Sequence, residues 1–183
     1  NVFGESMIAS YTVASRMENI LMIPIIGIQN TMATFAGQNM GARQPERVAK
    51  GLGQGVLVSL LMTAGLCLCQ LFGMELIIKA FKLDAAAAEI CRLHLFASVV
   101  AEPIFAIYFP ANGMFQGVGE GFHATFYALM ALGLRVVFAY SLYKTVFGYT
   151  AIWWSQAMAW TLTLITCYVH FFRGKWKEKS LVS

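Results

Sequence analysis

The sequence predicts an all-α membrane protein with five transmembrane helices. Of its 183 residues, 58% are hydrophobic and 12% are charged, whereas about a quarter of the residues of an average soluble domain carry a charge. A chain with half that charge has too few ionic groups to cover a surface that faces water. In addition, five segments are mostly apolar over about 20 residues, the length that a helix needs to cross a bilayer core of about 30 Å.

The five segments follow one another with short connections. The first contains Pro24 near its middle and the third contains Pro103 and Pro110. Because proline removes a backbone hydrogen bond, we expect bends at these positions. The second segment has no formally charged residue, the fourth contains Arg135, and the fifth is rich in aromatic residues. We predict the crossings at residues 9–37, 51–73, 89–116, 122–143 and 149–172.

The connections differ from the crossings in composition. Residues 38–50 form a polar connector with three cationic side chains, in which Pro45 suits the first turn of a helix and Glu46 suits its N-terminus. Residues 74–88 mix apolar and charged positions, and we predict a short helix on the membrane surface there. Residues 173–183 form a basic tail.

Lysine and arginine are distributed unevenly over the two sides that these crossings define. The side with the connector and the tail carries seven of them, and the other side carries three or four. The positive-inside rule therefore places the C-terminus in the cytoplasm. We take the plasma (inner) membrane as the location of this multi-pass protein. The rule also explains the net charge of +4 better than binding to nucleic acid, which needs the cations gathered along one surface.

Other features predict no signal peptide, disulfide or metal site. The chain starts at Asn1 without a charged segment, a short apolar core and a cleavage site, so we expect a fragment whose true start is missing. His94, His123 and His170 are scattered without ligand spacing. The four cysteines lie in apolar runs, and we interpret them as small buried hydrophobic residues. They are Cys67, Cys69, Cys91 and Cys167.

Several motifs together resemble the multidrug and toxic compound extrusion (MATE) family. The segment ASYTVASRMENILMIPIIGIQNTMATFAGQNMGARQPERVAK is similar to the second helix of a lobe of that family, with Arg16 before the run that reaches Pro24 and Gly-Gln and Gly-Ala pairs before a basic turn. NGMFQGVGEG resembles the turn after a lobe's fourth helix. LGLRVVFAYSLY resembles the family's next helix, and AIWWSQAMAWTLTLITCYVHFFRGKWKEK resembles its last helix and basic tail. The resemblance covers nearly the whole chain.

This resemblance implies both a fold and a function. The fold has twelve helices in two six-helix lobes, of which this chain supplies five helices of the C-terminal lobe. The function is that of a transporter and not of an enzyme: it exports organic cations, drugs or other amphiphiles by alternating access, in exchange for Na⁺ or H⁺ and without a cofactor. The implied partners are the N-terminal lobe of the same polypeptide, the lipid bilayer and small amphiphilic substrates, but no nucleic acid.

Glu102 is the candidate for coupling to the cation. It lies about midway along the third segment, directly before Pro103, and a charge near the middle of a bilayer costs roughly 2.5–3.5 kcal/mol on insertion scales. Pro103 frees the carbonyl of Val99, and a carbonyl beside a carboxylate offers oxygen ligands to Na⁺, whereas the carboxylate alone can carry H⁺. Two alternatives stay open: Glu102 pairs with Arg135 or another polar group to fix helix packing, or it lies at the membrane interface because the boundary of the third segment is displaced.

The face of the third segment around Glu102 predicts a substrate-binding wall. At about 100° per residue, this face holds small, aromatic and amide side chains, which suit a flat organic cation. For the polar and aromatic residues of the other segments, hydrogen bonding between helices and core packing are alternatives. The substrate-cavity candidates are Asn30, Phe109, Asn112, Gln116, Gln156 and Trp160, and the structural polar candidates are Arg16 and Arg135.

Three other functions compete with an exporter. A related flippase of lipid-linked saccharides or polysaccharides would share the architecture, but it would have a strongly cationic cavity, and Arg135 is the only cation deep in a predicted crossing. A membrane-embedded enzyme would need a His/Asp or paired-carboxylate group at one depth, and the sequence pattern shows none. A purely structural membrane subunit would not need a mid-membrane glutamate.

Overall fold

Five long helices make up most of the chain that the computed structural model describes, residues 4–145 and 148–178. They are α1 (Gly4–Gly41), α2 (Pro45–Ala80), α3 (Ala85–Gly117), α4 (Gly121–Tyr143) and α5 (Ala151–Arg173). Two 3-10 helices, η1 (Gly148–Thr150) and η2 (Lys175–Glu178), flank α5. No strand occurs within these residues, so the predicted all-α class is confirmed.

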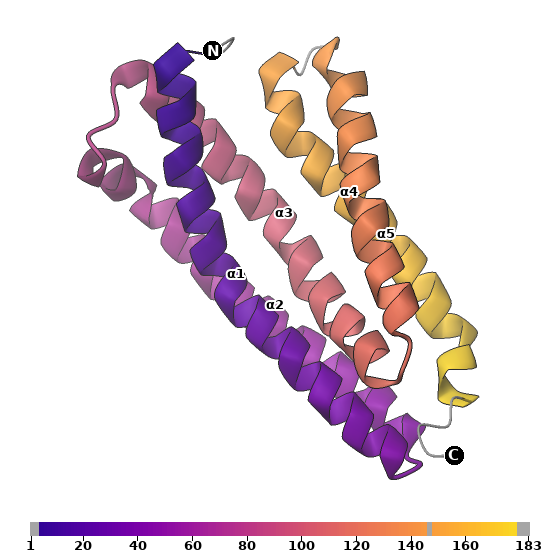
Figure 1. Ribbon diagram of the computed structural model, residues 1–183. Helices are drawn as coiled ribbons and strands as arrows, with labels where there is room; N and C mark the ends of the chain where they lie inside the picture. Colours follow the sequence, from indigo (N-terminus) through magenta and orange to yellow (C-terminus); the bar gives the residue numbers. More distant parts are fainter. Residues whose placement is uncertain (1–3, 146–147, 179–183) are drawn as a thin grey trace.

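Helix α3 lies at the centre of the molecule. Figure 1 shows α1 and α2 on one side of it and the antiparallel pair α4 and α5 on the other. α3 contacts all four of these helices. In its most apolar stretch 50% of the residues are buried, compared with 11–22% in α1, α2 and α4. A side chain on α3 is therefore within reach of every other long helix.

The helices are longer than the predicted crossings. α1 ends at Gly41 and α2 begins at Pro45, so the connector expected at residues 38–50 shrinks to the turn 42–44. Arg43 adopts a left-handed conformation with φ 56°, and the amide of Gln44 donates to the carbonyl of Asn39 at 2.8 Å, which closes the end of α1. The prediction that Pro45 opens a helix with Glu46 in its first turn is confirmed.

The separate surface helix predicted at residues 74–88 is not formed. Its first half continues α2 to Ala80, and its last residues begin α3 at Ala85. The break falls at Asp84, whose carboxylate accepts a hydrogen bond of 2.7 Å from the amide of Ala87 and so caps α3. Figure 1 shows that the last turns of α2 bend away from the rest of the helix.

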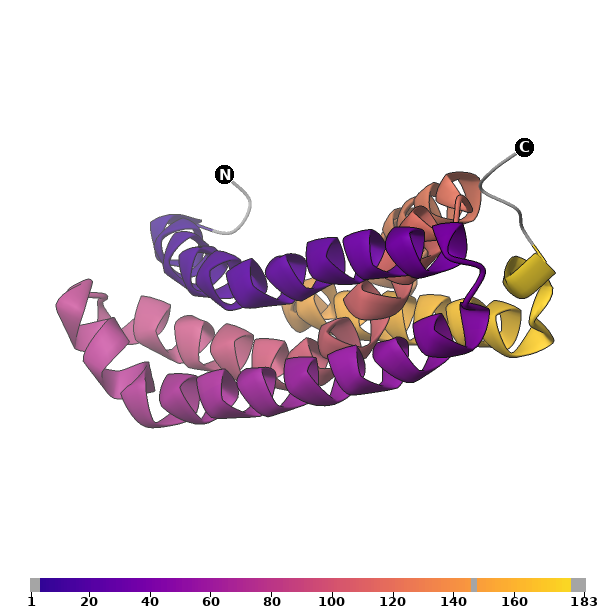
Figure 2. The same cartoon turned by 90° about the horizontal axis from the view of Figure 1, so that it is seen from below.

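Proline lies within the helices without ending them. Pro24 is inside α1, and Pro103 and Pro110 are inside α3. Seen from below in Figure 2, α1 changes direction part-way along its length, as predicted for a helix with an internal proline. Near Pro110, Tyr168 of α5 donates a hydrogen bond of 3.3 Å to the carbonyl of Ile107. This bond joins α5 to α3 next to Pro110.

Four helices, α1 to α4, are long and apolar enough to cross a membrane. α5 is not among them, although it has 23 residues, as many as α4, and a helix of that length spans about 35 Å. Its sequence contains three tryptophans, three threonines, one serine and one glutamine, and these residues lower its mean hydropathy. The fifth crossing therefore stays a prediction.

The seam between α1 and α3 brings their backbones into contact. Gly113 and Gly117 lie one turn apart on α3, and a methyl group at either position would collide with the carbonyls of Gln29 and Ala33 respectively. In membranes, where lipid tails are as apolar as leucine, such small-residue seams allow the close packing that holds helices together. This seam fixes α1 against the central helix.

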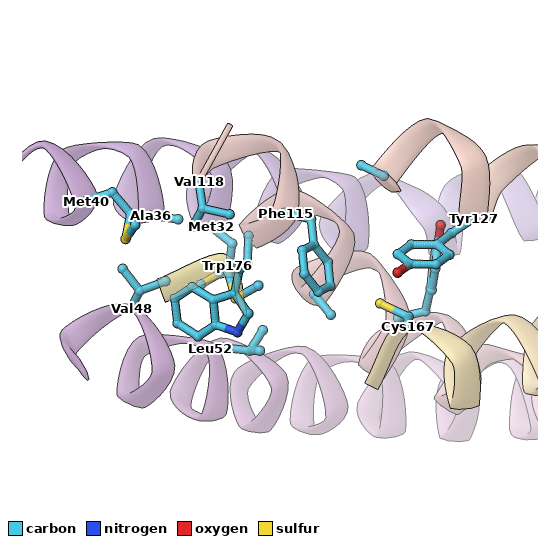
Figure 3. Close-up of a cluster of buried hydrophobic side chains, with 14 residues drawn as sticks. Met32, Ala36, Met40, Val48, Leu52, Phe115, Val118, Tyr127, Cys167 and Trp176 are labelled. Carbon is cyan, nitrogen blue, oxygen red and sulfur yellow. The ribbon is translucent and has the colours of Figure 1, made fainter. Parts of the chain in front are cut away.

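A buried apolar core continues from this seam toward the chain's C-terminal part (Figure 3). Trp176 of η2 is fully buried beside Val48 and Leu52 of α2. Its indole N–H donates to the carbonyl of Phe171 at 3.0 Å. Lys177, the next residue, forms an ion pair of 2.9 Å with Glu46. These contacts join the segment after α5 to the start of α2.

The cysteine prediction is correct for three of four residues. Cys67, Cys91 and Cys167 are buried, and all four cysteines are free. Cys69 is exposed, which corrects the expectation for that residue. Cys67 and Cys69 are two positions apart on α2, so they point to different sides of the helix, and only one side of α2 faces the other helices.

Candidate functional site

Four helices surround a cavity of about 240 Å³ next to the central helix. Its lining combines two carboxylates, one guanidinium, two amides and three aromatic rings. The lining residues are Glu18, Asn19, Met22, Glu102, Phe105, Phe109, Leu132, Arg135, Gln156 and Trp160. The predicted residues Glu102, Phe109, Gln156 and Trp160 thus come together. They belong to two helices, and 58 positions separate Glu102 from Trp160 in the sequence.

Glu102 is the most deeply buried polar group of this cavity. It is 1% exposed, and its Oε2 atom has no hydrogen-bond partner within the described residues. A buried carboxylate without a partner is costly, and such groups normally pair or bind a cation. Burial within the protein does not fix the depth of Glu102 in a bilayer, so a position at the membrane interface stays an open alternative.

Arg135 lines the same cavity from α4 but does not pair with Glu102. It is half-buried, and none of the ion pairs in residues 4–145 and 148–178 joins these two side chains. The direct ion pair considered as a packing device is therefore not formed. Arg135 instead places a positive charge on the cavity wall opposite two carboxylates, Glu102 and Glu18.

Aromatic rings form a continuous wall of the cavity. Trp160 of α5 meets Phe105 of α3 edge to face, with ring centroids 5.4 Å apart, and lies 5.8 Å from the ring of Phe109. Phe105 and Phe109 are one turn apart on α3 and meet at 6.1 Å. Faces of such rings attract cations and stack on flat apolar groups. Beside an unpaired carboxylate, this wall is suited to an amphiphilic cation.

Asn112 and Gln116 do not line this cavity, and their assignment as substrate-cavity residues stays a prediction. Asn112 is buried and accepts hydrogen bonds from Gln29 at 2.9 Å and from Gln116 at 2.7 Å. Its own amide donates to Tyr108 and to the carbonyl of Ala124, both at 2.9 Å. Asn112 therefore joins α1, α3 and α4. Gln116 shares a helical face with Glu102, but the 14 positions between them separate the two by about 21 Å along the axis.

Asn30 and Arg16 lie outside the cavity as well. Both are exposed on α1. The backbone carbonyl of Asn30 accepts a hydrogen bond of 3.1 Å from Thr34. In the part of the chain that the structure describes, the guanidinium of Arg16 makes no ion pair, so a structural role in packing is not visible for it.

The sequence of this chain matches the model of a known protein family. The family model described as MatE matches residues 1–141. The chain belongs to the MatE family. α1, α2 and α3 lie within the matched region, and α4 begins in it. Eight of the ten cavity residues lie on these helices, six of them on α1 and α3 and two on α4.

Solved structures share the fold of this MatE chain. One is an outward-facing multidrug resistance MATE family transporter of the MOP superfamily, with a TM-score of 0.87 and 18% identity over 97% of this chain. Another is a MOP superfamily transporter from Pyrococcus furiosus described by a binding pocket of reverse polarity, with a TM-score of 0.82 and 16% identity over 97% of this chain. No curated protein matches the sequence. The MatE chain spans 41% and 39% of the two solved chains.

The histidines of this MatE chain form contacts that the sequence analysis missed. His94 is 3% exposed, its Nε2 lies 3.0 Å from Oε1 of Glu18, and its ring stacks between Tyr11 and Trp153. This group holds the wall of the cavity at Glu18, next to the residues of α1 that line it. Sequence spacing gives no signal for it, because the residues come from three helices.

A second cluster joins the start of α4 to the end of α5. The ligand atoms of Glu120, His123 and His170 all lie within 4.8 Å of one another, which corrects the expectation that the histidines are scattered. Glu120 and His123 are three positions apart at the start of a helix, a visible signal. His170 could have been added only from the antiparallel register of α4 and α5.

Proposed function

We propose that this MatE chain is the C-terminal lobe of a cation-coupled antiporter that exports organic cations, drugs or other amphiphiles. The carrying observation is the buried, unpaired carboxylate of Glu102 in a cavity with an aromatic wall. A cation at this carboxylate removes the cost of leaving it unpaired. The protein is proposed to lie in the plasma membrane with its C-terminus in the cytoplasm.

Coupling follows if substrate and ion compete for the same negative charge. An amphiphilic cation would place its charge near Glu102 and its flat apolar part on Trp160 and Phe105. Na⁺ or H⁺ bound at Glu102 would neutralise the carboxylate and weaken the attraction of the substrate. Each ligand then favours release of the other, which is the requirement of exchange across a membrane.

The donor set admits either ion. The oxygen atoms of Glu18 and Glu102 and the amides of Asn19 and Gln156 face one cavity, and Na⁺ is a hard cation that prefers oxygen ligands. Proton exchange needs only the carboxylate. Alternating access needs a second repeat that moves against this one, and the proposed partner is the N-terminal lobe of the same polypeptide.

The charge of the cavity supports an exporter of cations over a flippase of lipid-linked saccharides. Two carboxylates, Glu18 and Glu102, face one guanidinium, Arg135. Phosphate head groups bind where cations outnumber anions, so this wall is unfavourable for them.

Efflux of ethidium from cells that express the intact transporter tests the proposal. The comparison is wild type against Glu102→Gln, with Glu89→Gln as the matched control, since Glu89 is exposed at the start of α3. We expect Glu102→Gln to lose gradient-dependent efflux and Glu89→Gln to keep it, at equal protein levels. Collapse of the Na⁺ gradient and of the proton gradient in separate assays distinguishes the two ions.

Two results would overturn the proposal in different ways. Efflux that is unchanged in Glu102→Gln would remove Glu102 from the coupling machinery and transfer that role to the other lobe. Absence of efflux in wild type, together with movement of a lipid-linked saccharide across the bilayer of reconstituted vesicles, would replace the exporter by the flippase.

A further inference from the structure

Three side chains with metal-binding atoms meet at one end of the α4–α5 pair, ten positions along α5 from Trp160 of the cavity around Glu102. They are Glu120, which precedes the first residue of α4, His123 in its first turn and His170 in the last turn of α5. Figure 1 shows that the start of α4 and the end of α5 lie at the same end of the molecule as the turn between α1 and α2. None of the three lines the cavity around Glu102, so the proposed transport site does not include this cluster.

The spacing of the ligand atoms is close to that of a tetrahedral site. Oε2 of Glu120 lies 3.1 Å from Nε2 of His170 and 3.5 Å from Nδ1 of His123. Two ligands of a tetrahedral zinc ion with bonds of about 2.0–2.1 Å are about 3.3 Å apart. The third distance can close by rotation of His123, whose side chain is 44% exposed and free of tight packing on its outer side.

The ring of His170 is already oriented to present Nε2 as a ligand. Its Nδ1 lies 2.6 Å from the hydroxyl of Tyr127, and its ring stacks on Phe115 at 4.8 Å with an interplanar angle of 13°. A hydrogen bond from Nδ1–H to Tyr127 leaves the lone pair of Nε2 directed at Glu120. Zinc-binding histidines almost always donate their other ring N–H in this way.

The surroundings leave room for a further ligand. Glu120 and His170 are 4% and 16% exposed, so the carboxylate and one imidazole sit in a protected place. A cavity of about 400 Å³ adjoins the cluster and is lined by His123, His170, Arg173 and Lys175 among others. A divalent ion bound by one carboxylate keeps a net positive charge, and two cationic residues beside it favour water or a small anion at the open position.

We propose that Glu120, His123 and His170 bind a divalent transition-metal ion, Zn²⁺, which ties the start of α4 to the end of α5. The His₂Glu set matches the nitrogen and oxygen ligands that zinc prefers, with the fourth position open. Because the ligands come from both helices, the metal adds stability by linking segments that are 47 positions apart, from His123 to His170.

Zinc binding to the intact, purified transporter after treatment with a chelator tests this site. The titration uses Zn²⁺ alone, in competition with a chromophoric chelator, and Co²⁺ replaces Zn²⁺ in a parallel absorption measurement. We expect His123→Ala and Glu120→Gln to weaken Zn²⁺ binding at least tenfold and to abolish the visible absorption of tetrahedral Co²⁺. Glu89 is an exposed glutamate at the start of α3, outside the cluster, so the Glu89→Gln variant should bind Zn²⁺ as wild type does.

Tyr127→Phe separates a positioning role from a ligand role. It removes only the hydroxyl that holds His170, so we expect Zn²⁺ binding to weaken by about 10-fold or somewhat more while the tetrahedral absorption of bound Co²⁺ remains. Wild-type protein that binds no Zn²⁺ would overturn the proposal, and so would binding that is the same in wild type and His123→Ala. Because the side chain of His123 is 44% exposed, we expect its truncation to leave the fold intact, so a loss of Zn²⁺ binding reports on the ligand.

Discussion

Two polar groups on α3, ten positions apart, differ in how they are satisfied. Asn112 exchanges hydrogen bonds with four partners from α1, α3 and α4, and no cavity touches it among those described for this chain. Glu102 is equally buried, lacks a partner for its Oε2 atom, and faces a cavity. The first arrangement holds the helices in place, and the second leaves an interaction for a ligand to complete.

The difference separates packing residues from binding residues within one helix. Satisfied polar groups stabilise a fold, and unsatisfied ones cost stability that a protein retains where function needs it. Substitutions around Asn112 should therefore lower stability, and substitution of Glu102 should lower transport while it leaves stability intact. The measurements below compare the two regions in the intact, detergent-solubilised transporter.

The largest loss of stability is expected in the seam next to Asn112. Gly113→Ala and Gly117→Ala each force a methyl group into a backbone carbonyl of α1, and such overpacking costs roughly 1–3 kcal/mol per site. We expect the thermal midpoint of the protein to fall in both variants. Gly133→Ala is the control, because open space surrounds that position on α4. Equal midpoints for Gly113→Ala and Gly133→Ala would contradict the close seam.

Asn112→Ala should have the next largest effect. It removes two hydrogen bonds within α3 and two that join α3 to other helices, those with Gln29 and Ala124. Bonds between membrane helices are worth about 0.6 kcal/mol each on average, so this interhelical pair alone accounts for roughly 1 kcal/mol. Gln116→Ala removes one of the same bonds from an exposed side chain and should cost a fraction of that. Unfolding in mixed micelles with increasing dodecyl sulfate measures both. A loss in Gln116→Ala as large as that in Asn112→Ala would show that the network does not centre on Asn112.

Glu102→Gln should behave in the opposite way. The amide keeps the shape of the side chain and removes the cost of an unpaired buried carboxylate, so we expect the free energy of unfolding to rise by about 1 kcal/mol or to stay the same. The same micelle assay measures this change in the absence of substrate. A clear loss of stability would indicate a bond that Glu102 makes within the fold, and it would remove the contrast with Asn112.

The fold class and much of the cavity could be predicted from the sequence because they depend on local pattern. Apolar length gives the helices, and a glutamate beside proline in an apolar segment marks Glu102. Glu102, Phe109, Gln156 and Trp160 line one cavity as a group. Depth along a helix was the missing quantity for Gln116, since a helical projection shows which face a residue occupies but not how far along the axis it lies.

The helix ends and the histidine cluster show where local pattern fails. Polar connectors still form helix, because the backbone hydrogen bonds of α1 and α2 continue past the apolar stretch until the turns at Arg43 and Lys82, which have positive φ angles. The cluster of Glu120, His123 and His170 depends on the register of α4 against α5, and register is a property of packing that no single segment encodes.

The smallest effect is expected at Asp84, the carboxylate directly before the first residue of α3. It is exposed and paired, since it accepts hydrogen bonds from the amide of Ala87 at 2.7 Å and from Ser6 at 3.1 Å. Both bonds lower the pKa of Asp84 below its ordinary value, and the bond from Ala87 has the larger effect. The stability that Asp84 adds is therefore complete above the ordinary pKa of about 3.9 and is lost as the pH falls through the lower, folded-state value.

Thermal midpoints of wild type and Asp84→Asn over a pH series measure this contribution. We expect wild type to be slightly more stable from neutral pH down to about pH 5, and the two to converge as the pH falls below about 4. Ser6→Ala, which leaves the cap to Ala87 intact, should show a smaller gap with the same direction. If the difference in thermal midpoint between wild type and Asp84→Asn does not change with pH, the charge of Asp84 adds nothing to the cap. In that case the ionised state of this exposed, paired carboxylate is unimportant for stability, in contrast to the buried carboxylate of Glu102.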